Sequence, residues 1–182
     1  MTKFERIIEN TPKGTILPSN LQKVCDYLEN TGYPISGCMK IRPDDFGGVR
    51  AWFGGDDGMA SNFAYFGSGP DGSMLALWLL NGKDATRAPV VHLGSEGINN
   101  AVLAEDFDSF LRLFGIGYNE IGFDNLDEPP EEPESAEEFR VWLVQELAIT
   151  CPETGTEIVR KAQASCPNIQ AAIDSWHKER IT

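Results

Sequence analysis

Two pairs of neighbouring aspartates flank an aromatic pair in a glycine-rich part of the chain. These residues are Asp44, Asp45, Trp52, Phe53, Asp56 and Asp57. Paired carboxylates can act as a general acid and base, or they can bind a hard cation. Neither pair has the alternating ligand spacing of a calcium-binding loop. The simpler interpretation is solvated loop acids. The sharper one is a binding surface on which acids steer a partner and aromatic rings anchor it.

Three other features allow a functional and a structural interpretation. Glu96 follows an expected strand, and it either joins the same surface or is an ordinary turn acid. Residues 67–72 match the letters of the dinucleotide-binding fingerprint, but an apolar run follows them instead of a helix, so we predict a hairpin loop. His92 lies in an apolar run and is interpreted as a structural strand residue rather than a general base. The nucleophile-elbow and zinc-protease motifs are absent. The sequence predicts no catalytic residue, no metal site and no cofactor. The least favoured hypothesis is a hydrolase that uses acidic side chains for catalysis.

Composition and charge limit the function classes further. The chain has 182 residues, with 15 basic and 28 acidic side chains and a net charge of −13. An apolar fraction of 41% is enough for a buried core. The acidic excess argues against binding to nucleic-acid phosphates or to an anionic membrane surface, and it is compatible with solubility or with a positively charged partner. No apolar signal sequence follows Met1, and no apolar run is long enough to span a bilayer, so we expect a cytoplasmic protein with four free thiols.

Apolar residues repeat at helical spacing in several segments. Residues 21–28 form one such stripe, and we expect Ser19 to be the N-cap of a capping box with Gln22. Residues 107–114 form another stripe, opened by two acids that suit a helix N-terminus. A shorter helix is expected around residues 4–8.

Between residues 36 and 104 the pattern changes to short runs rich in aromatic and branched residues. Glycine, proline, aspartate and asparagine separate these runs, which predicts successive antiparallel strands joined by turns. The expected strands cover residues 38–42, 49–53, 62–66, 74–80, 89–93 and 101–103.

An acidic, proline-rich stretch divides the chain. Residues 120–138 hold nine acids and no bases, so the rest of the chain has 19 acids against 15 bases, a net of −4. We expect a main domain over residues 1–119, an exposed linker over 120–134, and a helical extension over 135–182 that packs on the main domain. Ser135 is expected to cap the first of three helices in this extension.

The order of these elements resembles the SUKH superfamily, which includes fungal cell-wall-synthesis regulators and many bacterial immunity proteins. The likeness covers roughly residues 17–116. It is carried by an early Leu-Pro, an aromatic-Gly-x-Gly turn, a Pro-Val-Val strand with a small-residue loop, and a short strand before a Phe-rich helix. These are Leu17-Pro18, residues 63–69, residues 89–97, and residues 102–111.

The resemblance implies an α+β fold with a mostly antiparallel sheet flanked by helices, to which this chain adds a C-terminal helical extension. It also implies a non-catalytic immunity protein that binds and neutralises a cognate secreted bacterial toxin. The acidic charge fits a basic toxin, such as a nuclease, and the seven candidate residues named above would meet it. The alternative is a cytoplasmic ligand-binding or regulatory module related to the cell-wall regulators. The oligomeric state is left open.

Overall fold

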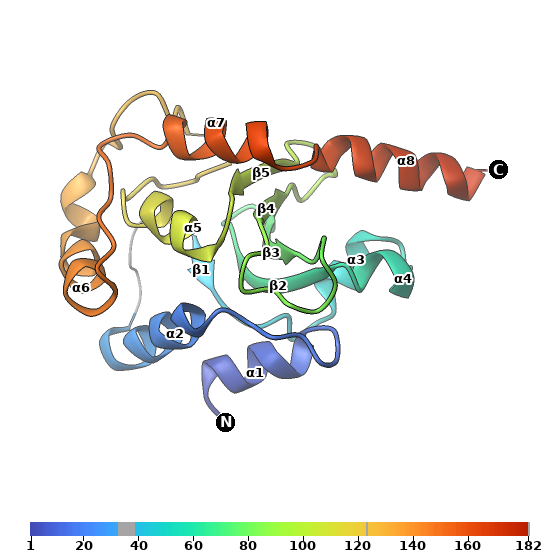
Figure 1. Ribbon diagram of the computed structural model, residues 1–182, viewed down its shortest axis with the longest axis horizontal. Coiled ribbons are helices and arrows are strands. Elements are labelled where there is room, and N and C mark those ends of the chain that lie inside the picture. The colour runs from blue at the N-terminus through green and yellow to red at the C-terminus, as the bar shows by residue number, and fades with distance from the viewer. Residues whose placement is uncertain (33–38, 123, 182) are drawn as a thin grey trace.

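An antiparallel sheet of five strands forms the centre of the molecule (Figure 1). The computed structural model describes residues 1–32, 39–122 and 124–181. The strands are β1 (Lys40–Ile41), β2 (Phe63–Ser68), β3 (Met74–Trp78), β4 (Val90–Leu93) and β5 (Ala101–Ala104). They lie side by side in the order of the sequence, and each neighbouring pair is antiparallel. The predicted hairpin at residues 67–72 is confirmed, because β2 and β3 pair across this turn.

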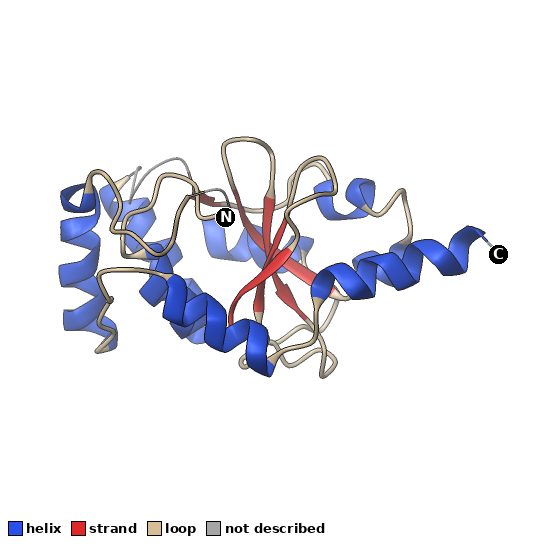
Figure 2. Cartoon of the chain, turned by 90° about the horizontal axis from the view of Figure 1, so that it is seen from above, coloured by secondary structure: helices blue, strands red, loops and turns tan. Residues whose placement is uncertain are grey.

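Helices cover both faces of this sheet, so the predicted α+β class is confirmed. They are α1 (Lys3–Asn10), α2 (Ser19–Thr31), α3 (Gly48–Trp52), α4 (Asp57–Ala60), α5 (Phe107–Phe114), the 3-10 helix η1 (Pro133–Ala136), α6 (Glu137–Leu147), α7 (Thr156–Ser165) and α8 (Ile169–Ile181). In Figure 1, α1 and α2 lie below the sheet while α7 and α8 run above it. Figure 2 shows α8 reaching beyond the sheet toward the C-terminus.

Side chains alternate between the two faces of the sheet and form two apolar clusters. Phe66 and Leu75 face α1, α2, α5 and α6, in a cluster that also takes Ile158 from α7. Phe63 and Trp78 face the other way, toward α3 and α8. The second cluster therefore joins the short α3 segment to the C-terminal helix through the sheet.

One predicted strand is a helix. Residues 49–53 were expected to be extended, because Val, Trp and Phe favour strands, but they lie mostly in α3. Val49 and Phe53 are four residues apart and both are buried, so a single helical turn places them on one face. A short apolar run fits either structure by pattern alone.

Both expected capping boxes are wrong at their first residue. Ser19 is the first residue of α2 and Pro18 occupies the cap position, with no side-chain hydrogen bond there. Ser135 lies inside η1, which starts at Pro133, because proline suits the first position of a helix. The expected helices themselves are confirmed. Cys38, the first residue of the expected strand over residues 38–42, lies outside the described residues.

The acidic stretch leaves α5 and crosses the surface to α6. Ile121 is buried, and Leu126 packs at the margin of the first cluster. Within the described ranges, no helix is both long enough and apolar enough to cross a bilayer.

Candidate functional site

The loop between β1 and α3 positions the first aspartate pair. The carboxylate of Asp44 accepts hydrogen bonds from the backbone N–H groups of Gly48 (2.6 Å) and Val49 (3.1 Å). These groups open α3 and lack partners within the helix, so Asp44 caps it. Asp45 and Phe46 follow in the turn, and Phe46 is 88% exposed. The turn thus sets a free aromatic ring next to two carboxylates.

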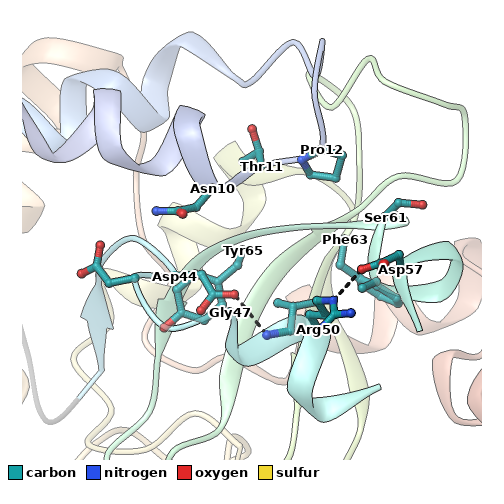
Figure 3. Close-up of a pocket in the computed structure, with 13 residues that line it drawn as sticks. Asn10, Thr11, Pro12, Asp44, Gly47, Arg50, Asp57, Ser61, Phe63 and Tyr65 are labelled. Atoms are coloured by element: carbon teal, nitrogen blue, oxygen red, sulfur yellow. Dashed lines mark hydrogen bonds and ion pairs between the residues drawn. The ribbon is translucent and has the colours of Figure 1, made fainter. Parts of the chain in front are cut away.

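A surface hollow of about 320 Å³ lies between the C-terminal end of α1 and the α3–α4 segment (Figure 3). Three predicted site residues line it, namely Asp44, Asp45 and Asp57. Phe63 and Tyr65 of β2 contribute aromatic surface to its wall. We call it the acidic hollow. Its remaining lining residues are Asn10, Thr11, Pro12, Gly47, Val49, Arg50, Ala60 and Ser61.

Two arginines neutralise carboxylates at this hollow. Arg50 of α3 lies 2.6 Å from Asp57 (Figure 3). Arg6 of α1 lies 2.5 Å from Asp45. Arg50 Nε donates a hydrogen bond to the Asp57 carboxylate, and this bond raises the pKa of the Arg50 guanidinium. All four side chains are substantially exposed, and exposed ion pairs are worth little and weaken with salt. The carboxylates of Asp45 and Asp57 can therefore exchange these arginines for the basic groups of a partner.

Tyr65 is the most enclosed polar group of the hollow. Burial raises the pKa of its hydroxyl, and the neighbouring carboxylates of Asp44 and Asp45 act in the same direction, while Arg42 opposes them. The phenol therefore stays neutral at physiological pH. It presents a hydroxyl and an aromatic face rather than a charge.

Trp52 and Glu96 form a second group, outside the acidic hollow. The indole Nε1 of Trp52 donates a hydrogen bond to the carbonyl of Gly94 (2.8 Å), which holds the loop after β4. Glu96 lies exposed in that loop. Neither residue lines the hollow. The indole of Trp52 thus positions the loop that carries Glu96.

Phe53 and Asp56 form a third group, which faces α8. Phe53 is fully buried, stacks on Phe63 with a centroid distance of 5.1 Å, and meets Trp176 edge-on at 5.2 Å. Its ring is therefore in the core and not on a contact surface, which corrects its place among the binding residues. The Asp56 carboxylate accepts hydrogen bonds from Trp176 Nε1 (2.9 Å) and from the N–H of Met59 (3.0 Å). These bonds, the Trp176 bond first, lower the pKa of Asp56.

Several lining residues of the acidic hollow were missed by the sequence analysis. Asn10 to Pro12 come from the end of α1, more than 30 positions before Asp44. No spacing rule connects them to the aspartates. Phe46 does not line the hollow, but its place between Asp45 and a glycine is a turn signal that the sequence shows directly.

A second set of titratable groups lies around β4. His92 of β4 is buried, and its Nδ1 lies 2.8 Å from the carbonyl of Asn99. Glu120 lies near it, and partial burial, with Asp71 and Asp124 close by, raises the pKa of the Glu120 carboxyl. Within the described parts of the chain, no three histidine, cysteine or acidic side chains are placed to share a metal ion.

Together these features define the class of molecule: an α+β protein whose sequentially ordered sheet supports an acidic surface hollow. Comparison with protein-family models gave no match, and searches of curated proteins and of solved structures gave no significant match either.

Proposed function

We propose that this protein is a non-catalytic immunity protein that binds a basic bacterial toxin and neutralises it. The observation that carries the proposal is the convergence of Asp44, Asp45 and Asp57 on one hollow. The exposed Phe46 follows Asp45 in the sequence. Charged side chains at an interface raise the rate and specificity of association, whereas buried aromatic anchors supply most of the affinity. The carboxylates of the hollow supply the charge, and Phe46, next to Asp45 in the sequence, supplies an exposed aromatic ring.

The exposed ion pairs at the hollow indicate how a toxin would bind. Arg6 and Arg50 are already held by Asp45 and Asp57, so a toxin lysine or arginine would exchange one ion pair for another. Phe46 would meanwhile leave water for the toxin surface. A nuclease fits this chemistry, because its substrate-binding surface has to carry clustered basic groups to hold phosphates.

The fold gives the proposal independent support. The resemblance to SUKH proteins implies an α+β fold with a mostly antiparallel sheet flanked by helices, and the chain has this architecture. Membership of that superfamily is part of the proposal.

The test is protection of cells from the toxin encoded beside this gene. The chain is co-expressed with the product of the adjacent open reading frame, and growth and complex formation are measured. We expect Asp45→Lys with Asp57→Lys to abolish protection and to weaken binding by about 100-fold or more, because close charge reversals at an interface cost several kcal/mol. The matched control reverses two exposed acids of α6, Glu137→Lys with Glu146→Lys, and should protect like the wild type. Failure of the wild-type chain to bind or protect would refute the proposal.

A small-ligand module is the second candidate, because the volume of the acidic hollow, about 320 Å³, falls within the range of small-molecule sites. The acidic lining would select a cationic ligand. This candidate predicts that polyamines or amino sugars raise the melting temperature of the isolated protein, and that Asp57→Lys removes the effect. A purely protein-binding surface predicts no such shift.

A further inference from the structure

The acidic connector, residues 120–134, is fixed to the body of the protein by Tyr118. The Tyr118 hydroxyl donates to the carbonyl of Glu128 (2.7 Å) and accepts from the N–H of Gly155 (3.0 Å). The carbonyl of Leu126 accepts from the N–H groups of Gly155 and Thr156, each at 3.1 Å. The middle of the connector is therefore held against the start of α7.

Arg140 of α6 fixes the other end of the connector. Its guanidinium donates to the carbonyls of Pro133 (2.6 Å), Gly115 (3.1 Å) and Ile116 (3.2 Å). Arg140 is thus engaged by carbonyl groups. In the described part of the chain, no ion pair involves an acid of the connector. The connector is therefore anchored mainly through its backbone carbonyl groups.

Two hollows of this connector share Pro129 and Pro130 as lining residues, and we call these two residues the proline wall. The first hollow, which we call the proline groove, measures about 380 Å³, and its other lining residues are Ile116, Pro133, Arg140, Cys151, Pro152 and Glu153. The second, which we call the acidic side hollow, measures about 250 Å³, and its lining residues include Tyr118, Asp124, Glu128 and Glu131. Neither shares a lining residue with the acidic hollow of α3 and α4.

We propose that this proline wall is a docking site for a protein segment that carries an aromatic side chain next to a lysine or arginine. The aromatic ring enters the proline groove, and the basic group enters the acidic side hollow. Proline rings present flat, rigid apolar faces, and aromatic grooves that bind proline-rich peptides use the same contact in the opposite sense. The wall is ordered before binding, so little conformational entropy is lost on docking.

Charge decides between an acidic and a basic segment. Glu153 borders the proline groove, and Glu128 and Glu131 border the acidic side hollow. Arg140 also lines the proline groove, so the charges there are balanced, whereas the lining of the acidic side hollow holds acids and no base. A segment with acidic residues beside its aromatic ring would be repelled from the acidic side hollow, whereas a basic one is attracted. This site goes beyond the proposed toxin surface and does not depend on the identity of a toxin.

The test uses the isolated protein and short synthetic peptides. The probe is Gly-Ser-Lys-Trp-Arg-Ser-Gly, titrated to millimolar concentration while backbone amide shifts are followed by NMR. We expect shifts at Glu131, Cys151 and Glu153. A peptide with alanine in place of tryptophan should bind about tenfold more weakly, because the anchor is lost. A peptide with glutamates in place of both basic residues should not bind.

Two protein variants localise the contact. Glu131→Lys should weaken binding of the basic peptide about two- to fivefold, the value of an exposed charge pair. Glu138→Lys changes the net charge equally, but Glu138 lines neither hollow, so this variant should bind like the wild type. Equal binding of the alanine peptide, shifts confined to other surfaces, or an equal loss in Glu138→Lys would each overturn the proposal. None of these results bears on toxin protection.

Discussion

The two sides of the α3–α4 segment use the same residue types for opposite purposes. At the acidic hollow, Asp57 pairs with an exposed arginine, and Phe46, two residues before α3, lies in solvent. On the side that faces α8, Asp56 accepts the indole N–H of Trp176 and Phe53 is fully buried. Asp56 and Asp57 are neighbours in the sequence. Their roles differ because one side chain has a fixed partner from another helix.

This difference separates residues that maintain the fold from residues that are free to bind. A carboxylate that holds α8 in place cannot bind a partner without losing a contact that stabilises the fold. A carboxylate paired with an exposed arginine can bind a partner instead, because that ion pair contributes little to stability. Substitutions on the two sides should therefore affect stability and binding in opposite proportions.

The largest expected effect on stability comes from truncating Phe53, and Phe46 is its matched control. Phe53→Ala removes a ring that contacts Phe63 and Trp176, so we expect it to lower the free energy of unfolding by about 3–5 kcal/mol. Phe46→Ala should change it by less than about 0.5 kcal/mol, because that ring is exposed. Urea denaturation of both variants measures this. Similar losses in the two would remove the distinction between the two sides.

A smaller loss of stability is expected when the hydrogen bond between Trp176 of α8 and Asp56, the N-cap of α4, is removed. Trp176→Phe keeps an aromatic ring on Phe53 and removes the donor to Asp56, so we expect the melting temperature to fall by about 2–4 °C. The control is Trp142→Phe on α6, whose indole also packs on aromatic rings but makes no hydrogen bond to another described residue. Calorimetry of the two variants should show the larger fall for Trp176→Phe.

The pH dependence of stability should distinguish Asp56 from its neighbour. The pKa of Asp56 is lowered in the folded protein, below its ordinary value of 3.8, chiefly by the Trp176 hydrogen bond. Its charged form therefore stabilises the fold above the unfolded pKa, and this contribution is lost as the pH falls through the folded pKa. We expect Asp56→Asn to be less stable than the wild type at pH 7 and to approach it as the pH falls below 4. A pH-independent difference in urea midpoints would show that charge is not the cause.

Much of the architecture could be predicted from the sequence, because strands and long helices leave periodic patterns. The stripe at residues 107–114 and the hairpin at residues 67–72 follow local rules, and both are present. The α3 turn could not be predicted in this way. Residues 49–53 favour a strand by composition, and what makes them helical is the cap from Asp44 together with burial of Val49 and Phe53 against the sheet.

The sequence indicated which residue types could form the candidate site, but not which of these residues lie together. The sequence placed seven residues on one surface, and the structure divides them among the acidic hollow, the loop after β4 and the interface with α8. The separating partners come from α1 and α8, and the bond between Trp176 and Asp56 spans 120 positions. Contacts of that range have no local signal in a single sequence.

Substitution of Asp45 or Asp57 should have the smallest effect on stability and the largest effect on binding. Asp45→Asn and Asp57→Asn remove exposed charges that pair with Arg6 and Arg50, so each should change the free energy of unfolding by less than about 0.5 kcal/mol. Each should nonetheless slow association with a basic partner, and the difference from the wild type should shrink as salt is added, because screening removes long-range attraction. Stopped-flow association rates at low and high ionic strength, set beside urea midpoints, measure both quantities. A variant that lost stability but kept its association rate would place its carboxylate with Asp56, among the groups that hold the fold.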